Sequence, residues 1–343
     1  MKGFASDNYS GAHPEVLEAM VAANAEHVVA YGADPWSDRA RTLLQDHFGE
    51  QAESFLVWNG TGANVTILRA MCRPWNAVVC AASAHINVDE GGAPEFLAGT
   101  KLLDLPTPDG KLTPELVQSA VIRVGDEHAV QAKVISITQT SELGTLYTAG
   151  EIRALADLAH ANDMYLHVDG ARLANAAAAL GEPLRAFTTD AGVDAVSFGG
   201  TKNGMVSGEA VVLLNPELVP GFQWIRKQSM QLASKGRFLA AQFVALLEGD
   251  LWLRSAAHAN AMGARLAAAV GELPGVQITQ ATQANVVFAI LPPAATAQLQ
   301  ADWPFYVWDE ATGEVRWMCS WDTTEADVDA FVAVVQSELA RQA

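Results

Sequence analysis

Hydrophobic residues from position 54 onward fall into short runs that alternate with amphipathic helical patterns. Thr148 and Glu151 form a capping box before one such pattern. Ile152, Leu155 and Ala159 then mark a single apolar face. Strands that alternate with helices predict right-handed crossovers and an α/β fold with a mainly parallel sheet, covered on both faces. The apolar runs are SFLVW (54–58), NAVVCA (76–81), KLLDL (101–105), AKVISIT (132–138), MYLHVD (164–169), DAVSF (194–198) and GEAVVLLN (208–215).

The pattern changes in the C-terminal part of the chain. Residues 216–270 are rich in alanine and predict long helices, and a last helix carries Val328, Phe331 and Val335 on one face. The stretches between them predict a small antiparallel sheet, so the chain is expected to form two domains. These stretches are GVQIT (275–279), NVVFAIL (285–291), PFYVWD (304–309) and VRWMCSWD (315–322). The last two stretches are interpreted as a core hairpin and not as a binding platform, with Trp317 and Trp321 as packing and Arg316 as the functional exception.

Composition narrows the class of protein. Of 343 residues, 50% are hydrophobic and only 17% are charged, which is typical of a globular chain that buries further surface in an oligomer. The net charge of −18 argues against nucleic acid or an anionic membrane as partner. No run of about 18 apolar residues is long enough to span a bilayer, and the N-terminus lacks the apolar core of a signal peptide. Cys72, Cys80 and Cys319 share no metal-binding or redox spacing. We therefore expect a cytoplasmic protein with buried free thiols and no metal.

Residues that can do chemistry follow the predicted strands. In parallel sheets, ligands bind outside the carboxyl ends of the strands. The residues in that place are 59–62 after the first strand, His85 after the second, and then 138–142, 169–172 and Lys202. Together they offer a small-residue loop, an imidazole, a carboxylate, a guanidinium and an amine.

The stretch WNGTGAN (58–64) predicts a strand-to-helix turn that leads into a helix over 62–72. Free N–H groups and the helix dipole at such a turn can hold a phosphate. A dinucleotide fingerprint does not fit, because the third glycine is missing and Cys80 stands where an acidic residue is required. A plain turn remains an alternative.

Asp169 and Lys202 both follow buried runs, where charge is costly unless it is paired. Asp169 requires a cation, either Arg172 three residues later or a protonated ring nitrogen of a ligand. Desolvation would lower the pKa of Lys202 and give an amine that can form a Schiff base. Their order after a phosphate loop fits pyridoxal phosphate, with the phosphate at 60–64, the ring nitrogen at Asp169, the aldehyde carbon at Lys202 and His85 stacked on the ring.

Longer stretches carry a family resemblance: FASDNYSG, YGADPW, NGTGAN, AHINVDEGGAPEF, ITQTSELG, HVDGARL, FGGTKNGM, QLASKGRFLAAQ and VRWMCSWD. With them the sequence resembles, nearly from end to end, the low-specificity L-threonine aldolases and their phenylserine-aldolase-like subgroup, which are fold-type-I pyridoxal-phosphate enzymes. The resemblance implies an N-terminal arm (1–15), a large cofactor-binding domain with a seven-stranded sheet (16–248) and a small C-terminal α+β domain (249–343). It also implies reversible cleavage of L-threonine, L-allo-threonine and related β-hydroxy-α-amino acids to glycine and an aldehyde.

The resemblance implies roles for individual residues as well. The cofactor would be held by Lys202, Asp169, His85, Arg172, Gly60, Thr61 and Asn64, and the substrate carboxylate by Ser6, Arg172 and Arg316. Tyr31 and Arg237 would reach the site from a neighbouring subunit of a dimer, which is expected to pair into a tetramer.

Ser141 marks a departure from the family pattern, because many members have a histidine at this substrate-binding position. Serine cannot act unaided as a base near neutral pH, which makes His85 the better candidate for the base. Two other functions remain open at this point. One is a different pyridoxal-phosphate lyase that eliminates or dehydrates β-hydroxy amino acids, and the other is a cofactor-binding protein without turnover.

Overall fold

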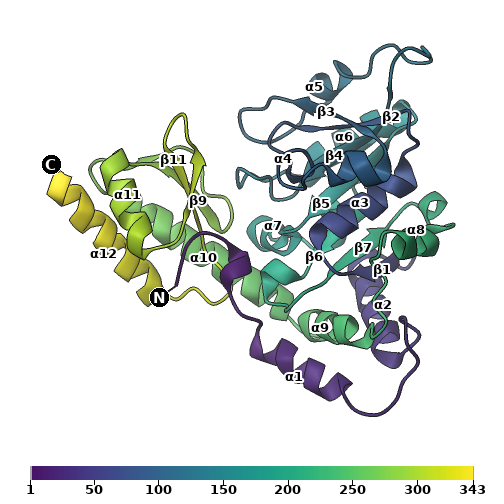
Figure 1. Ribbon diagram of the computed structural model, residues 1–343, viewed down its shortest axis with the longest axis horizontal. Coiled ribbons are helices and arrows are strands. Elements are labelled where there is room, and N and C mark those ends of the chain that lie inside the picture. Colours follow the sequence, from purple (N-terminus) through teal and green to yellow (C-terminus); the bar gives the residue numbers. More distant parts are fainter. Residues whose placement is uncertain (1, 343) are drawn as a thin grey trace.

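The computed structural model describes residues 2–342, and its larger part is built on a seven-stranded sheet (Figure 1). The strand order is β1-β7-β6-β5-β4-β2-β3. Strand β7 is antiparallel to its neighbours β1 and β6, and the remaining neighbours are parallel. The predicted α/β fold with a mainly parallel sheet is therefore confirmed. The strands are β1 (Glu53–Val57), β2 (Asn76–Ala81), β3 (Lys101–Leu105), β4 (Gln131–Thr138), β5 (Tyr165–Gly170), β6 (Ala195–Gly199) and β7 (Glu209–Leu213).

Helices surround this sheet and continue into the C-terminal part of the chain. They are α1 (Pro14–Ala23), α2 (Pro35–Phe48), α3 (Gly60–Met71), α4 (His85–Val88), α5 (Pro114–Gln118), α6 (Ala149–Ala161), α7 (Leu173–Leu180), α8 (Phe222–Gln228), α9 (Arg237–Leu247), α10 (Leu251–Gly271), α11 (Pro293–Asp302) and α12 (Glu325–Gln342). Short helical turns lie at η1 (Asp7–Tyr9), η2 (Pro94–Ala98), η3 (Leu184–Phe187), η4 (Thr201–Asn203) and η5 (Pro216–Leu218).

The sheet is covered on both faces, because every residue of β2, β6 and β7 is buried. Helix α6 shows how the sequence encodes one of the covering elements. The Thr148 Oγ1 atom accepts the N–H of Glu151, and the Glu151 carboxylate accepts the N–H of Thr148 in return. The predicted capping box is confirmed, and Ile152, Leu155 and Ala159 are buried behind it.

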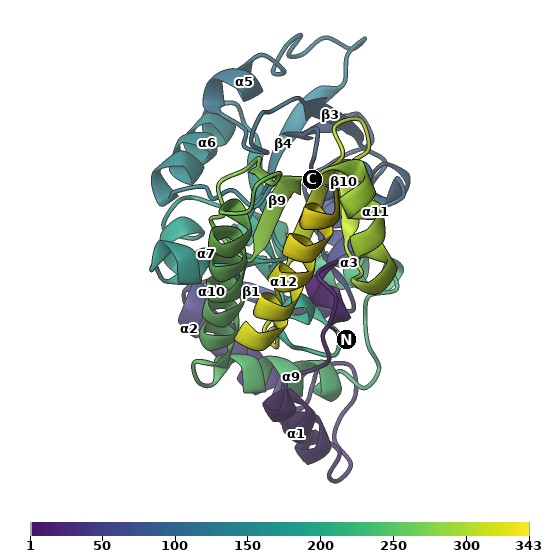
Figure 2. The same cartoon turned by 90° about the vertical axis from the view of Figure 1, so that its left-hand side faces the viewer.

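The C-terminal lobe contains the second sheet, whose strand order is β10-β11-β9-β8 and whose pairs are all antiparallel. Its strands are β8 (Gln277–Ile278), β9 (Val286–Ile290), β10 (Tyr306–Asp309) and β11 (Glu314–Met318). Helices α10, α11 and α12 cover its outer face (Figure 2). Val287, Trp317 and Phe331 belong to a core separate from that of the large sheet. The small antiparallel sheet is as predicted, whereas the limits at 15/16 and 248/249 stay predictions.

The long helices predicted over 216–270 are confirmed only for α10. The chain forms two shorter helices before it, α8 and α9, which are separated by residues 229–236. Met230 adopts a left-handed conformation with φ of 60°, which a continuing α-helix does not allow. The alanine-rich pattern correctly predicted helices in this range, but it did not predict the interruption at residues 229–236.

The N-terminal segment crosses from the small lobe to the large one. The N–H of Phe4 bonds to the carbonyl of Pro304, and the N–H of Met318 bonds to the carbonyl of Phe4, each at 2.8 Å. Further along, the N–H of His13 bonds to the carbonyl of Gly204 at 2.8 Å. The segment between these contacts therefore runs past the turn that carries Lys202, close to residues of both lobes.

Candidate active site

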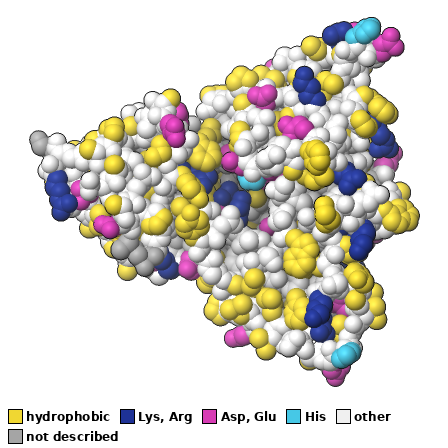
Figure 3. Space-filling model, viewed as in Figure 1, with side chains coloured by type: hydrophobic (Ala, Val, Ile, Leu, Met, Phe, Trp, Pro, Cys, Tyr) yellow, Lys and Arg dark blue, Asp and Glu magenta, His cyan; other side chains and the backbone are white. Residues whose placement is uncertain are grey.

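A cleft between the two lobes brings together most of the residues predicted to do chemistry. Figure 3 shows Lys, Arg and His side chains gathered in the hollow beside the left-hand lobe, with hydrophobic side chains around them. The outer part of the cleft is lined by Ser6, His85, Glu142, Arg172, Lys202, Tyr306, Trp308 and Arg316, among others. A narrower inner part is lined by Gly60, Asn64, His85, Glu90, Asp169, Arg172 and Lys202, with further residues of the turn after β4. The cleft thus lies at the carboxyl ends of the parallel strands, as predicted.

Lys202 reaches the cleft from η4, which follows strand β6 directly. A Cβ atom on Gly199 would lie 2.4 Å from the carbonyl oxygen of Ala171, and one on Gly200 would lie 2.3 Å from the sulfur of Met205. Gly199 is therefore required for the close packing of this turn against the residue after β5, and Gly200 for its packing against Met205. Burial, together with the positive charge of Arg172, lowers the pKa of Lys202. The fold thus positions an amine that gives up its proton more readily than a surface lysine.

Asp169 is buried at the end of β5, where it belongs to a network of polar side chains. Its Oδ1 atom accepts the N–H of Ala171 at 3.0 Å, and its Oδ2 atom accepts the amide of Asn64 at 2.8 Å. The same amide donates to Glu90 at 2.8 Å, and the Asn64 carbonyl accepts the hydroxyl of Ser197 at 2.6 Å. These contacts fix the carboxylate while it faces the inner cleft.

The phosphate loop differs from the prediction in its detail. Helix α3 begins at Gly60 and not at residue 62, because Asn59 caps it by accepting the N–H of Gly62 at 2.7 Å. The N–H groups of Gly60 and Thr61 lie in the first turn, where a helix offers them no acceptor, and they remain candidates for a phosphate. The prediction that Asn64 binds the phosphate is corrected, because its side-chain amide is fully engaged in the Asp169 network.

His85 opens α4 and lines both parts of the cleft. Its ring Nδ1 lies 2.9 Å from the Oε1 atom of Glu90, and this hydrogen bond raises the pKa of the imidazole although burial acts against it. Its backbone N–H bonds to Glu142 at 2.8 Å. Two carboxylates therefore hold the histidine from opposite ends, one by the ring and one by the main chain.

The two arginines predicted to bind a substrate carboxylate differ sharply in their surroundings. Arg172 donates from Nε and Nη2 to both oxygens of Asp7, at 2.7 and 2.9 Å. Burial alone would raise the pKa of Asp7, but this arginine holds it below its usual value. The salt bridge between Arg172 and Asp169, considered as an alternative from the sequence, is therefore wrong. The partner is Asp7, an acid 165 positions earlier in the chain.

Arg316 is the guanidinium with donors left over. It stacks 4.6 Å from the ring centre of Trp308 and 5.4 Å from that of Tyr306, and it donates to the carbonyl of Ala5 at 3.1 Å. Its Nε atom is buried and has no partner within residues 2–342. Burial and the charge of Arg172 lower its pKa to about 10. An anion in the outer cleft would relieve this cost, so Arg316 is the stronger candidate for a carboxylate.

The interpretation of this stretch as a core hairpin holds only in part. Trp317 is fully buried, as predicted, whereas Tyr306 and Trp308 line the outer cleft beside Arg316. Ser6 lines the same cleft, as predicted for a substrate-binding residue, and its hydroxyl accepts the N–H of Asn8 at 3.2 Å.

Ser141 does not line the cleft. It is buried in the turn after β4, where its hydroxyl lies 2.6 Å from that of Thr145 and also contacts the carbonyl of Asp109. A Cβ on Gly110 would lie 2.9 Å from the same oxygen, which shows how closely it is enclosed. The prediction of Ser141 as a substrate-binding residue is corrected for this reason.

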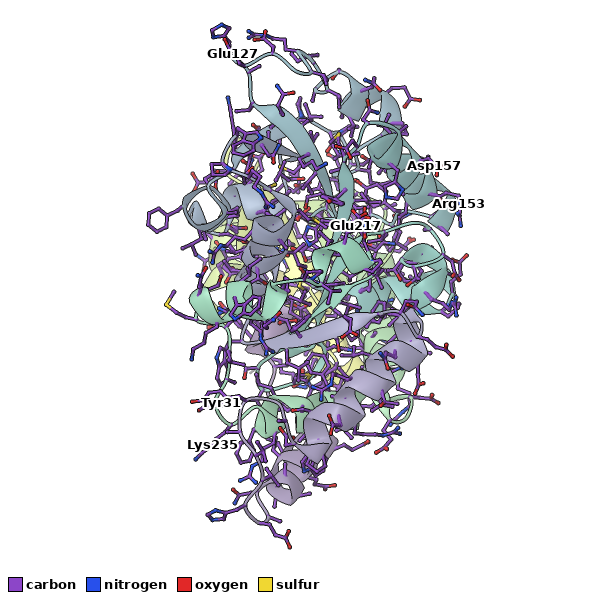
Figure 4. All side chains as sticks on the ribbon, turned by 90° about the vertical axis from the view of Figure 1, so that its right-hand side faces the viewer. Tyr31, Glu127, Arg153, Asp157, Glu217 and Lys235 are labelled. Carbon is purple, nitrogen blue, oxygen red and sulfur yellow. The ribbon has the colours of Figure 1, made fainter. Side chains whose placement is uncertain are left out.

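Tyr31 and Arg237 lie outside the cleft of their own chain. Tyr31 is 55% exposed and lines a separate depression with Arg41 and Arg226, at the periphery of the view in Figure 4. Arg237 donates to the carbonyls of Ala25 and Glu26. One chain therefore does not bring these two residues to Lys202, and their predicted role depends on a second subunit.

Three acids of the site were not predicted from the sequence, namely Asp7 and Glu90, which are buried, and Glu142, which is half-buried. Each lies within a stretch that was quoted for its resemblance, but none follows a periodic pattern that would predict its burial. The only local signal is the proximity of Glu90 to His85 and of Glu142 to the end of β4. Their partners come from other elements, and this pairing becomes visible only in three dimensions.

The residues of the inner cleft fit pyridoxal phosphate. Asp169 faces the cavity as a fixed carboxylate, Lys202 faces it as an amine with a lowered pKa, and Gly60 stands at the helix end. A Cβ on Gly60 would meet nothing within 4 Å, so the first turn of α3 is open to a bulky anion. This arrangement is typical of the fold-type-I enzymes that use this cofactor.

Comparison with known proteins identifies the family. The β-eliminating lyase family matches residues 3–291, and the chain belongs to this family and, within it, to the low-specificity L-threonine aldolases. It is 42% identical to the low-specificity L-threonine aldolase of a Pseudomonas species over 97% of both chains, and 44% identical to that of Pseudomonas aeruginosa over 93% of both. The structure of a threonine aldolase from Leishmania major matches with a TM-score of 0.93 and 31% identity, covering 99% of this chain and 100% of that one.

Proposed function

We propose that this protein is a pyridoxal-phosphate-dependent lyase that cleaves a carbon–carbon bond. Its substrates would be L-threonine, L-allo-threonine and related β-hydroxy-α-amino acids, including phenylserine, which it would split reversibly into glycine and an aldehyde. The observation that carries the proposal is that Lys202 and the fixed carboxylate of Asp169 line the inner cleft together, while Lys202 also lines the outer cleft with the partly unpaired guanidinium of Arg316. The names of its Pseudomonas relatives support the same reaction.

Five residues of the chain have defined tasks in this proposed reaction. The bound cofactor would supply a ring that delocalises the electron pair left on Cα. Lys202 would hold the cofactor covalently, Asp169 would keep the ring nitrogen protonated, and the turn at Gly60 and Thr61 would bind the phosphate. Arg316 would bind the substrate carboxylate and so fix rotation about the N–Cα bond, which selects the bond to Cβ for cleavage.

The active unit is proposed to be a dimer, with pairing into a tetramer. Tyr31 is exposed, and its φ of 61° holds it in a conformation that costs free energy unless the fold has a use for it. Val29, Trp224 and Met230 on neighbouring surface segments are also more than half exposed, which supports a subunit contact there. Subunits carrying Lys202→Ala should regain activity when mixed with subunits carrying Arg237→Ala, because one hybrid site would be intact. If stable mixed dimers of the two variants form but show no activity, the proposal of a shared site is wrong.

Within residues 2–342, no helix is both long and apolar enough to cross a membrane. The three cysteines are free and buried, which supports the proposal of a reducing compartment, the cytoplasm. Fractionation of cells that produce the protein at its natural level tests this.

The proposed reaction is tested by its products. Purified protein with pyridoxal phosphate should release equal amounts of glycine and aldehyde from L-threonine, L-allo-threonine or L-phenylserine, each offered separately. The competing function is dehydration of the substrate by the same site. It is considered because the matching family is described as β-eliminating lyases. It would give a 2-oxo acid and ammonia instead, and that outcome would replace the aldolase proposal.

A further inference from the structure

Glu142 is a half-buried acid of the cleft to which the roles above give no task. It lies in the turn after β4 and lines both the inner and the outer part of the cleft. Its Oε1 atom accepts the N–H of His85 and the hydroxyl of Thr138, each at 2.8 Å. Its Oε2 atom is buried and has no hydrogen-bond partner among the described residues. One carboxylate oxygen thus anchors the side chain while the other remains available.

An unpaired buried oxygen is costly, so its presence beside a reaction cavity calls for a reason. Ser83, whose hydroxyl is likewise buried without a partner in the described part of the chain, lines the same outer cleft. Glu90, whose Oε2 atom is also buried without a partner in the described part of the chain, lines only the inner cleft. The two unpaired groups of Glu142 and Ser83 in the outer cleft indicate that a polar group of the ligand meets them there. On a β-hydroxy amino acid, whose amine is directed to Lys202 and whose carboxylate is directed to Arg316, the remaining polar group is the β-hydroxyl.

The other candidates for handling the β-hydroxyl proton are less available. The hydroxyl of Ser141 is enclosed by Thr145 and Asp109, away from the cleft. The Nδ1 atom of His85 is engaged by Glu90. Its Nε2 atom is the competing acceptor, but the Glu90 contact raises the pKa of the ring and so favours the protonated imidazole, which cannot accept a proton. Burial raises the pKa of Glu142, which brings a carboxyl closer to the range in which it can both accept and donate a proton. Position and chemistry therefore agree on Glu142.

We propose that Glu142 is a catalytic residue that exchanges a proton with the β-oxygen of the substrate. In cleavage, the ionised Oε2 atom accepts the hydroxyl proton, and the electron pair of the O–H bond becomes the second bond of the aldehyde C=O. The pair of the Cα–Cβ bond stays on Cα, delocalised as described above. Once the aldehyde has left, Glu142 returns its proton to water, and Cα takes up a proton from water, which completes glycine. In the synthetic direction the protonated carboxyl donates to the aldehyde oxygen.

The turn that carries Glu142 is also packed against the small lobe. Leu143 contacts a cluster formed by Val286, Phe288 and Met318 from strands β9 and β11. A Cβ on Gly144 would lie 2.3 Å from the side chain of Val286. The turn that carries the carboxyl is therefore held against the small lobe, which also supplies Arg316 to the outer cleft.

The test separates the β-oxygen step from all other steps of the site. Glycine has no β-oxygen, yet exchange of its α-hydrogen with D₂O requires the cofactor, Lys202 and the carboxylate site. Glu142→Gln keeps an acceptor for His85 and Thr138 but cannot take up the proton. It should lower aldehyde release from L-phenylserine by about 100-fold or more, as expected for loss of a general base. Glycine exchange, followed by NMR, should stay within about threefold of the parent.

Glu127→Gln is the matched control, because Glu127 is an exposed acid at the opposite end of the view in Figure 4 from Tyr31. It should change neither rate. Equal loss of cleavage and exchange in Glu142→Gln would assign Glu142 a merely structural role, and no loss of either would assign the proton transfer to another group. Both results would overturn the proposal.

A second variant covers the case in which Glu142→Gln does not fold. Glu142→Asp keeps a carboxyl and withdraws it by one methylene, so cleavage should fall more than exchange, and a parallel fall would again overturn the proposal. The inference rests on the proposed function, and the two can be told apart. A parent protein that exchanges glycine but cleaves no β-hydroxy amino acid contradicts the function itself, before any variant is made.

Discussion

Replacement of Arg316 by alanine should remove substrate binding without unfolding the protein. The contacts that Arg316 makes within the chain are one hydrogen bond to Ala5 and two ring contacts, to Trp308 and Tyr306. These contribute about 1 kcal/mol and about 0.5–1 kcal/mol each. The variant also removes the buried unpaired Nε, which relieves about 1–3 kcal/mol. The two effects nearly cancel, so the melting temperature should stay within about 3 °C.

Catalysis should respond very differently. Loss of one partner of a desolvated charge pair costs about 2–5 kcal/mol. At 1.36 kcal/mol for each factor of ten, kcat/KM should fall by roughly 30-fold to several thousand-fold. Turnover at saturation should fall too, because the carboxylate contact also fixes which bond is aligned for cleavage.

The assay is aldehyde release over a range of L-threonine concentrations, with thermal melting measured on the same samples. The matched control is Arg265→Ala, which removes an exposed arginine of the same lobe that pairs with Asp329. A kcat/KM of Arg316→Ala within threefold of this control would refute the assignment of Arg316 to the substrate carboxylate.

Three further predictions concern ionisable side chains that are wholly or partly buried. Asp7→Ala leaves Arg172 without its partner and should lower the free energy of unfolding by about 3–5 kcal/mol. Because the pKa of Asp7 is lowered, this difference in thermal melts should be present above pH 3.8 and vanish as the pH falls through the folded-state value. Glu90→Gln should lower the pKa of His85 in an NMR titration, and an unchanged titration would contradict the ring contact. Because the pKa of His85 is raised in the folded protein, its contact with Glu90 stabilises the fold fully below pH 6.5. This stabilisation is lost as the pH rises through the pKa of His85 in the folded state. Burial raises the pKa of all three thiols, so a thiol reagent should modify none of them in the native protein and all of them in denaturant.

The sheet was predictable because its central strands are short apolar runs, and those of β2, β6 and β7 are buried throughout. DAVSF followed by two glycines is the clearest case. The run gives β6, and the glycines give the turn that the close approach of Ala171 requires. Lys202 and Asp169 could be placed at one edge for the same reason, since the direction of parallel strands fixes where their ends meet.

The pairing between distant side chains could not be read from the sequence. Nothing in the neighbouring sequence indicates that Arg172 binds Asp7 and not Asp169, because the sequence alone does not show which acid lies close to the guanidinium in space. The N-terminal segment decides it, by hydrogen bonds of Phe4 to the small lobe and of His13 to Gly204. Likewise, Asn64 was assigned to the phosphate from its place in the loop, whereas the helix turns its side chain toward Asp169.

The central claim is that Lys202 carries the cofactor, and chemical labelling tests it most directly. Borohydride reduction of the protein incubated with pyridoxal phosphate fixes the cofactor on the lysine that holds it, and trypsin does not cleave after a modified lysine. The account predicts one labelled peptide, spanning residues 186–226 with the added mass on Lys202. A label on a different lysine, or aldehyde release by Lys202→Ala at the rate of the parent protein, would contradict it.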